Sequence, residues 1–243
     1  MEVKLTDCYT LSEGKALMSG TEALVRLLLE QSRIDRMNGL RTKGLVSGYP
    51  GSPLGGLDIA LGKAKSFLDE EGIYFQPAVN EELAATALWG SQHINLYDNP
   101  SVQGVFSMWY GKGPGLDRAM DALRHANQGG VAPHGGMVIA VGDDPTGKSS
   151  TLAYQSDQNF HSLGIPYFFP KNVSEIIPMG LEAFALSRYS GCCVGLKIVV
   201  DTADSNAVVD MSRLRPNFPK MKPNKLVHVT KHDPAGARES KLH

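Results

Sequence analysis

Segments in which apolar residues recur every three or four positions alternate along the chain with short, continuous apolar runs. The first pattern is typical of helices that bury one face, and the second is typical of strands buried inside a sheet. The first long helix is predicted to begin with Thr21 as its cap and to end before Gly39. The patterns predict helices at about 21–38, 57–70, 81–96, 114–127 and 173–188, and strands at about 45–47, 73–76, 102–108, 137–141 and 194–200.

Strands that alternate with helices imply right-handed crossovers, and therefore a mostly parallel sheet with helices on both faces. We predict this α/β fold for the chain. Functional sites in such folds gather at the C-terminal ends of the strands. Three glycine-rich loops follow predicted strands, at Gly48–Gly56, Gly111–Gly115 and Gly142–Gly147. We therefore expect the functional site to lie among these loops.

Composition and charge narrow the class of protein. The formal net charge of the 243 residues is -1, which gives no general attraction to nucleic acid or to anionic membranes. No apolar run reaches membrane-spanning length, and the first residues, MEVKLTDCYTL, lack the features of a secretion signal. Cys8, Cys192 and Cys193 provide neither a disulfide framework nor a C-x-x-C metal pair. We expect a cytoplasmic protein with reduced cysteines that binds neither nucleic acid nor membranes.

The character of the sequence changes near its C-terminal end. From Pro216 to His243 there are four prolines and six Lys or Arg, but only two acidic residues and no sustained apolar period. No aromatic platform is interleaved with the basic residues, which argues against nucleic-acid binding. We expect residues 1–212 to form the folded domain and residues 213–243 to be a basic, proline-containing tail or linker, disordered in the isolated chain.

Residues Gly142–Ser149 match the phosphate-loop pattern G-x-x-x-x-G-K-[ST] and follow a predicted strand. In such a loop Lys148 would contact the phosphates. Three features argue against it. Pro145 has no N–H to donate, Asp143 and Asp144 add negative charge beside the proposed anion, and the following segment is too polar and irregular for a helix. A phosphate-loop nucleotide-binding protein remains open as an alternative.

Five blocks of sequence, in a fixed order and spacing, give the same residues a different interpretation. They are GYPGSPLGGLD (48–58), FQPAVNEELAATALWGSQ (75–92), GVFSMWYGKGPGLDR (104–118), HGGMVIAVGDDP (134–145) and KSSTLAYQSDQ (148–158). Together they resemble the pyrimidine-binding domain of the 2-oxoacid:ferredoxin oxidoreductases, and most closely the N-terminal part of the fused indolepyruvate enzymes. The resemblance runs from the N-terminus to about Asp210.

The resemblance implies a thiamine-diphosphate-binding fold and the oxidative decarboxylation of a 2-oxoacid. Electrons would pass through iron–sulfur clusters to ferredoxin, and the acyl group would pass to coenzyme A. Glu81 would be the catalytic glutamate that hydrogen-bonds the pyrimidine ring nitrogen and helps the cofactor lose its C2 proton. Its position, after a predicted strand and at the start of a helix, suits this role. The structural alternative is that Glu81 and Glu82 only favour the positive end of that helix.

The resemblance also assigns the remaining candidate residues. Tyr49 and Ser52 lie in the family's substrate loop, whose hydroxyl contacts the 2-oxoacid, although GYPGSP could equally be an ordinary proline turn. Lys112 is a candidate anion contact at the cofactor; the alternative is the ordinary start of a helix, for which Pro114 and Asp117 are typical first-turn residues. A hydrogen-bonded turn behind the site, with a mainly structural role, is expected for Asp143, Asp144, Ser149, Ser150 and Asp157. The histidines lack metal-ligand spacing, so no metal is assigned to this chain.

Several parts of the family's machinery are missing from the sequence. We find no G-D-G…N motif for magnesium and diphosphate and no cysteine set for iron–sulfur clusters. We therefore expect a fragment or separate subunit, inactive alone and oligomeric, which shares its thiamine diphosphate site with missing diphosphate-binding and cluster domains. A non-catalytic assembly module remains a third possibility. The 2-oxoacid is not fixed by the sequence; an arylpyruvate is the closest resemblance, followed by branched-chain oxoacids.

Overall fold

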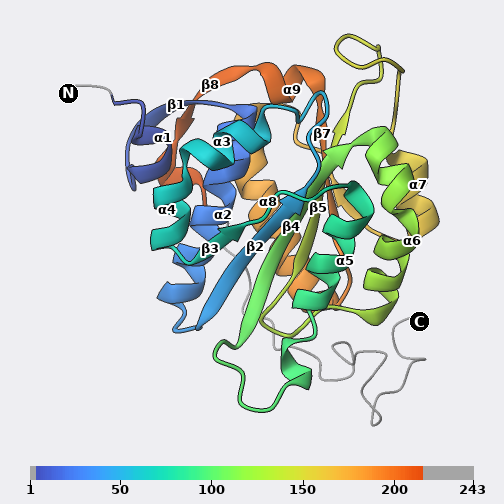
Figure 1. Cartoon of the computed structure of the whole chain (residues 1–243). Coiled ribbons are helices and arrows are strands. Elements are labelled where there is room, and N and C mark those ends of the chain that lie inside the picture. Colours follow the sequence, from blue (N-terminus) through green and yellow to red (C-terminus); the bar gives the residue numbers. More distant parts are fainter. Residues whose placement is uncertain (1–3, 216–243) are drawn as a thin grey trace.

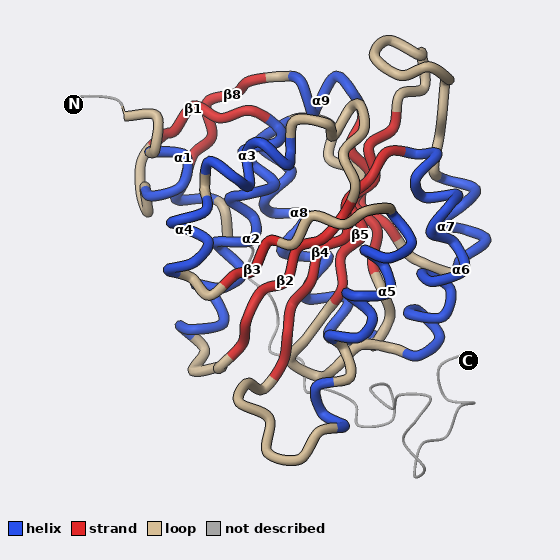
Figure 2. The backbone as a smooth tube through the Cα atoms, viewed as in Figure 1, coloured by secondary structure: helices blue, strands red, loops and turns tan. Residues whose placement is uncertain are grey.

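A six-stranded parallel sheet forms the centre of the molecule (Figures 1 and 2). The computed structural model describes residues 4–215. The strand order is β3-β2-β4-β5-β7-β6, so β4 and β5 are the central strands. The predicted parallel α/β architecture is confirmed. The strands are β2 (Thr42–Gly48), β3 (Ile73–Phe75), β4 (Gly104–Lys112), β5 (Met137–Asp143), β6 (Tyr167–Phe168) and β7 (Val194–Val199).

Helices cover both faces of the sheet, as the alternating pattern predicted. Successive strand residues point to opposite faces, so Met108 and Ala140 join one hydrophobic core while Trp109 and Ile139 join the other. The first core contains residues of α1–α4, α8 and α9, and the second contains residues of α5–α7. These helices are α1 (Asp7–Thr10), α2 (Gly20–Met37), α3 (Leu57–Lys63), α4 (Lys65–Glu70), α5 (Glu81–Ser91), α6 (Gly113–Gly129), α7 (Asp157–Leu163), α8 (Val173–Ser190) and α9 (Val200–Asp204).

A second, two-stranded antiparallel sheet, formed by β1 (Lys15–Ser19) and β8 (Asn206–Asp210), was not predicted. It brings together the two ends of the described chain (Figure 1). Ala16 and Val209 are buried opposite each other, whereas the next pair, Leu17 and Val208, is 61% and 60% exposed. The exposed apolar residues Leu17 and Val208 interrupt the alternation of apolar and polar positions, so neither strand gives a periodic signal in the sequence.

The first predicted helix is correct in extent but not in its cap. Ser19, rather than Thr21, caps α2: its Oγ accepts from the backbone N–H of Glu22 at 3.2 Å, and the Glu22 carboxylate accepts from the Ser19 backbone N–H at 2.8 Å. This reciprocal pair is a capping box. The predicted helix 57–70 is divided into α3 and α4 at Ala64, where the backbone leaves helical geometry.

Two further differences affect the functional site. The predicted strand 102–108 extends to Lys112 because the aromatic residues Trp109 and Tyr110 continue it into the glycine-rich segment. The loop expected at Gly111–Gly115 is therefore the end of β4 and the first turn of α6. The predicted helix 81–96 ends at Ser91, followed by a short 3-10 turn at Ile94–Leu96. The segment judged too polar for a helix contains α7.

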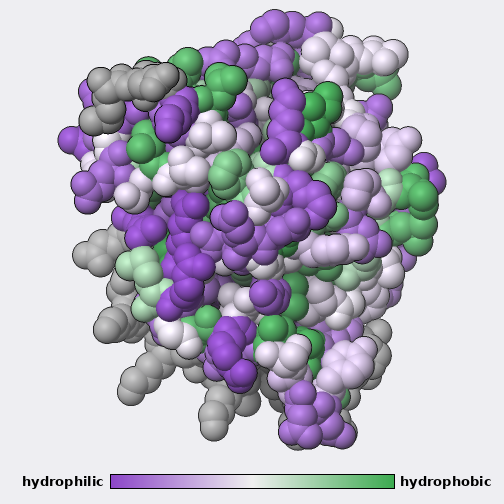
Figure 3. Space-filling view, turned by 60° about the vertical axis from the view of Figure 1, so that its left-hand side comes forward, coloured by the Kyte–Doolittle hydropathy of each residue, from purple (hydrophilic) through white to green (hydrophobic). Residues whose placement is uncertain are grey.

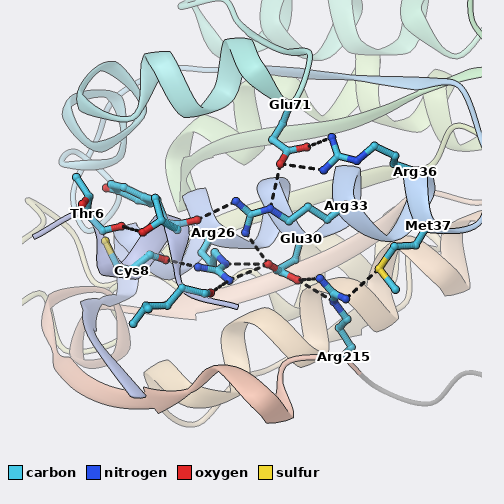
Figure 4. A network of polar contacts seen from close by, with 12 residues as sticks. Thr6, Cys8, Arg26, Glu30, Arg33, Arg36, Met37, Glu71 and Arg215 are labelled. Atoms are coloured by element: carbon cyan, nitrogen blue, oxygen red, sulfur yellow. Dashed lines mark hydrogen bonds and ion pairs between the residues drawn. The ribbon is translucent and has the colours of Figure 1, made fainter. Parts of the chain in front are cut away.

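A network of arginines and glutamates fastens both ends of the described chain to α2 (Figure 4). Glu30 is 2% exposed and pairs with Arg26 at 2.9 Å, Arg33 at 2.8 Å and Arg215 at 2.9 Å. Arg26 also donates to the backbone carbonyl of Cys8 at 2.9 Å. Burial alone would raise the pKa of Glu30, but the arginines around it lower the pKa below its ordinary value.

The surface and the ends of the chain complete the description. Hydrophobic residues are scattered among hydrophilic ones on the face shown in Figure 3. Across residues 4–215, no helix has both the length and the apolar character needed to cross a membrane, and no group of three or more His, Cys, Asp or Glu is placed to hold a metal ion. Cys8 and Cys193 are buried, and Cys192 is partly exposed. Of the predicted tail, only residues 213–215 lie within the described part of the chain.

Candidate active site

Three loops meet at the C-terminal edge of the sheet. Strands β2, β4 and β5 are neighbours, and their last residues lie in register, with Gly48 beside Tyr110 and Lys112 beside Gly142. Because the strands are parallel, the segments that follow them start at the same edge. Of the four residues predicted for the site, Tyr49 and Ser52 follow β2, Lys112 ends β4, and Glu81 opens the helix after β3.

The loop after β2 is held against the turn after β5. The Ser52 hydroxyl donates to Ser149 Oγ at 2.6 Å, and the Ser150 hydroxyl donates to the Ser52 backbone carbonyl at 3.0 Å. A Cβ on Gly142 would lie 2.9 Å from Pro53 Cδ, so only glycine lets the two segments approach this closely. Tyr49, at the start of the loop, is 39% exposed. GYPGSP is thus a fixed loop that presents Tyr49 and Ser52 at the sheet edge.

Lys112 belongs to the same cluster. It is the last residue of β4 and the N-cap position of α6, without a side-chain capping bond. Its aliphatic stem lies over Gly51, because a Cβ at residue 51 would approach Lys112 Cδ to 2.7 Å. The structure therefore brings Lys112 against the loop that carries Tyr49 and Ser52. No anion-binding role of Lys112 follows from this contact alone.

Glu81 opens α5 and is 6% exposed. Asn80 caps the helix by accepting from the Leu83 backbone N–H at 2.8 Å, and the Glu81 backbone carbonyl accepts from Trp109 Nε1 at 3.0 Å. These contacts fix the main chain of Glu81. Within residues 4–215, by contrast, the Glu81 carboxylate accepts no hydrogen bond; its ion-pair partner, Arg118 Nε, approaches only to 3.9 Å. The side chain is 8% exposed, so a ligand at the sheet edge can reach this carboxylate.

Gly115 and Arg118 are parts of the site that the sequence did not reveal. A Cβ at Gly115 would lie 2.8 Å from both Cγ and Oε1 of Glu81, so the first turn of α6 packs directly on the glutamate side chain. The same turn begins with Lys112, which contacts the other candidate loop. Both positions lie inside the block 104–118, but only the observed packing of α6 against α5 shows that they face Glu81.

The structure does not favour the phosphate-loop alternative. The backbone N–H groups of Lys148, Ser149 and Ser150, which would have to face a phosphate, donate to the Asp144 carboxylate at 2.9, 2.7 and 2.7 Å. Burial alone would raise the pKa of Asp144, but these N–H groups outweigh it and lower the pKa to about 2. Lys148 Nζ pairs with Asp201 at 3.0 Å, and the next helix after the turn begins only at Asp157. An internal carboxylate occupies the place of the anion.

Asp143 points away from Asp144, as successive residues of a strand do. It is fully buried, and its Oδ2 accepts from both the backbone N–H and the hydroxyl of Ser156 at 2.8 Å. Lys197 Nζ lies 3.6 Å from Asp143 and 2.6 Å from Asp157. Desolvation raises the pKa of Asp143 despite these partners. The two aspartates therefore support separate hydrogen-bonded groups, and their charges do not face each other.

The fold is shared with enzymes that act on 2-oxoacids. The chain superimposes on a Magnetococcus marinus 2-oxoglutarate:ferredoxin oxidoreductase with a TM-score of 0.56 and 18% identity, over 84% of this chain and 32% of that one. It superimposes on a Rhodococcus jostii thiamine diphosphate-dependent 4-hydroxybenzoylformate decarboxylase with a TM-score of 0.52 and 14% identity, over 82% and 32% of the two chains. These likenesses confirm the predicted type of fold.

The sequence relatives indicate a narrower class of protein than the shared fold does. The chain is 27% identical over 214 residues to the indolepyruvate oxidoreductase subunit IorA of Methanothermobacter marburgensis, covering 88% of this chain and 31% of that protein. It is 28% identical over 219 residues to the subunit of the same name from Pyrococcus abyssi, covering 87% and 29%. No family model matches. The chain resembles indolepyruvate oxidoreductase subunits, as its motifs predicted, and spans about 30% of their length.

Proposed function

We propose that the chain is the pyrimidine-binding part of a thiamine-diphosphate-dependent 2-oxoacid:ferredoxin oxidoreductase. The observation that carries this proposal is the Glu81 carboxylate, which is buried at the sheet edge and accepts no hydrogen bond from residues 4–215. The pyrimidine ring nitrogen of the cofactor could form the hydrogen bond that this carboxylate does not make within residues 4–215. The relatives named as indolepyruvate oxidoreductase subunits support the reaction class.

The residues present fit the cofactor. Glu81 is held at its main chain by Trp109 and packed at its side chain by Gly115, so its carboxylate has a defined direction. Glu81 lies in the first turn of α5, at the positive end of the helix. Thiamine diphosphate, when bound, supplies a carbon acid whose anion attacks the carbonyl of a 2-oxoacid. Glu81 holds or releases the proton at the pyrimidine ring nitrogen and thereby tunes the basicity of that ring.

Tyr49, Ser52 and Lys112 form the part of the proposed site that receives the substrate. The Ser52 hydroxyl can donate to the substrate carboxylate, because the fixed loop presents it at the same edge as Glu81. Tyr49, in the same loop, is 39% exposed and flanks the substrate. Lys112 contacts Gly51 of this loop and supplies positive charge toward the cofactor or the substrate anion.

The remaining machinery belongs to partner domains or subunits. The chain spans about 30% of the length of its relatives, which supports a site shared with a domain that binds magnesium and the diphosphate. The proposed enzyme passes electrons through iron–sulfur clusters to ferredoxin and transfers the acyl group to coenzyme A. Its substrate is an arylpyruvate such as indolepyruvate. The proposed location is the cytoplasm, because three cysteines give no disulfide framework, and the complete enzyme is an oligomer.

The test is Glu81→Gln in the enzyme assembled from this chain and the chain or domain that holds the diphosphate. We expect 2-oxoacid-dependent dye reduction to fall by about a hundredfold or more, in line with the loss of an acid–base group. Assembly, measured by light scattering after size exclusion, should not change. Glu82→Gln is the matched control because Glu82 is the exposed neighbour in the same helical turn. The 243-residue chain alone should show no turnover.

Retention of nearly full activity by the Glu81→Gln enzyme would contradict the catalytic assignment. It would favour the non-catalytic assembly module, which binds a partner chain but is indifferent to this substitution. Turnover by the isolated chain, with thiamine diphosphate, magnesium and coenzyme A present, would contradict the shared site.

A further inference from the structure

The turn that resembles a phosphate loop is organised around the Asp144 carboxylate. Asp144 is 1% exposed although it lies in a segment that extends beyond the sheet edge between β5 and α7 (Figure 1). One carboxylate oxygen accepts from the Lys148 backbone N–H, and the other accepts from the N–H groups of both Ser149 and Ser150. Charge-assisted bonds of this kind are about twice as strong as neutral ones. Asp144 therefore determines where these two serines stand.

The same two serines hold Ser52 from both sides. Ser149 Oγ accepts the Ser52 hydroxyl at 2.6 Å, and the Ser150 hydroxyl donates to the Ser52 backbone carbonyl at 3.0 Å. Ser149 Oγ also lies 3.4 Å from Asp144 Oδ2, so its own proton is directed to the carboxylate. Ser149 is left to accept from Ser52. The hydroxyl and the main chain of Ser52 are both fixed by a turn nearly one hundred residues away in sequence.

We propose that Asp144 is a positioning residue for Ser52, acting through Ser149 and Ser150. This inference rests on the proposed function of Ser52 as a contact for the 2-oxoacid carboxylate. In the free site the Ser52 O–H points to Ser149. When a substrate carboxylate arrives, the Ser52 hydroxyl rotates about the Cβ–Oγ bond and donates its hydrogen bond to the carboxylate instead. No covalent bond breaks. The hydrogen bond from the Ser150 hydroxyl to the Ser52 backbone carbonyl holds the main chain, and with it Ser52 Oγ, in place during this rotation.

A matched control is available in the same turn. Lys148 Nζ pairs with Asp201 at 3.0 Å, with both side chains largely exposed, and among residues 4–215 neither side chain has a hydrogen bond or ion pair to the loop that carries Ser52. Asp201→Asn therefore removes one negative charge next to the turn without touching the path from Asp144 to Ser52. Asp144→Asn removes the charge on the path itself. Ser149→Ala keeps the carboxylate and its three backbone bonds but removes the acceptor of the Ser52 hydroxyl.

The first measurement uses the full 243-residue chain and does not depend on activity. In Asp144→Asn, amide hydrogen exchange at Ser149 and Ser150 should accelerate by about tenfold or more, because hydrogen bonds to a charged acceptor are lost. NMR scalar couplings should report one Ser52 χ1 rotamer in the unaltered chain and averaged rotamers in Asp144→Asn. Ser149→Ala should release the Ser52 rotamer with little change in exchange. Asp201→Asn should resemble the unaltered chain in both measurements.

The second measurement uses the assembled enzyme. Asp144→Asn and Ser52→Ala should each raise the KM for the 2-oxoacid by about tenfold and change kcat less, since both weaken a substrate contact. The double variant should be no worse than Ser52→Ala alone, because the two residues act on one path. If the double variant is additive, or if the Ser52 rotamer stays fixed in Asp144→Asn, the proposal is wrong. If Ser52→Ala leaves KM unchanged while the rotamer is released, the proposed function of Ser52 fails and the positioning stands.

Discussion

At Gly115, the addition of a single methyl group should lower the activity of the enzyme without lowering the stability of the fold. A Cβ there would lie 2.8 Å from Cγ and Oε1 of Glu81, whereas ordinary contacts begin at 3.4 Å. Gly115 lies in α6 and does not have a positive φ, so alanine fits the backbone. It should favour the helix by about 0.5–1 kcal/mol relative to glycine. The Glu81 side chain, which can rotate, therefore has to move.

The size of the effect follows from that displacement. Restoring an ordinary contact moves the Glu81 carboxylate by about half an ångström, and misplacement by about 1 Å can cost a hundredfold in rate. We therefore expect kcat/KM of the assembled Gly115→Ala enzyme to fall by about tenfold, equivalent to about 1.4 kcal/mol. The assay is 2-oxoacid-dependent dye reduction, with urea unfolding of the full chain measured in parallel.

Gly62→Ala is the control for this prediction. Gly62 also lies in a helix, α3, and is exposed, and a methyl group added there would meet nothing within 4 Å. Alanine at this position should therefore bring a similar gain in stability without any change in kcat/KM. Activity of Gly115→Ala within twofold of the unaltered enzyme would refute the reasoning. A loss of activity that only follows a loss of stability would refute it as well.

The remaining predictions concern the stability of the fold and the phosphate-loop alternative. Glu30→Gln should destabilise the chain by about 3–5 kcal/mol at pH 7, because it leaves the buried Arg26 without its negatively charged partner. The control Asp69→Asn, in an exposed ion pair, should cost less than about 0.5 kcal/mol. Since the folded-state pKa of Glu30 is lowered, its stabilisation is complete above the ordinary pKa of 4.5 and is lost as pH falls through the folded value. In urea unfolding, the difference in stability between the unaltered chain and Glu30→Gln should therefore narrow only below about pH 4.5. An equal gap at pH 3 would contradict this. Gly113→Ala should lower stability by about 1–3 kcal/mol in the same assay, because its Cβ would overlap the ring of Tyr154; an unchanged midpoint would count against it. Calorimetry should detect no MgATP binding, before or after Lys148→Ala, and binding that this substitution abolishes would restore the phosphate-loop alternative.

The long elements could be predicted because each buries a regular set of side chains. The helix 21–38 and the strand 137–141 differ from the observed α2 and β5 by one or two residues at their ends. The β1–β8 pair could not be predicted, because both strands expose apolar residues, Leu17 and Val208, and so lack the alternation of a half-buried strand. Pairing between segments almost two hundred residues apart leaves no local pattern in either of them.

The candidate site was predictable only in part, and for a related reason. The resemblance located Glu81 and Ser52 on their loops, since whole blocks of sequence carry them. The neighbours that hold them, Gly115 beside Glu81 and Ser149 beside Ser52, come from other blocks. A glycine within GKGPG or a serine within KSST gives no sign in the sequence of the side chain that it will face. Those pairings become visible only when the sheet brings the ends of β2, β4 and β5 together.

The turn at residues 142–150 shows why a segment can match a phosphate-binding sequence motif without having the geometry to bind phosphate. A phosphate loop requires backbone N–H groups that converge on an empty place, where an anion from solvent can enter. Here the N–H groups of three successive residues converge on Asp144, which is itself the anion and is covalently part of the loop. A free phosphate would have to displace a carboxylate that cannot diffuse away, and would meet its negative charge. The same geometry that prevents nucleotide binding leaves Ser149 and Ser150 rigid, which is the property that a support for Ser52 requires.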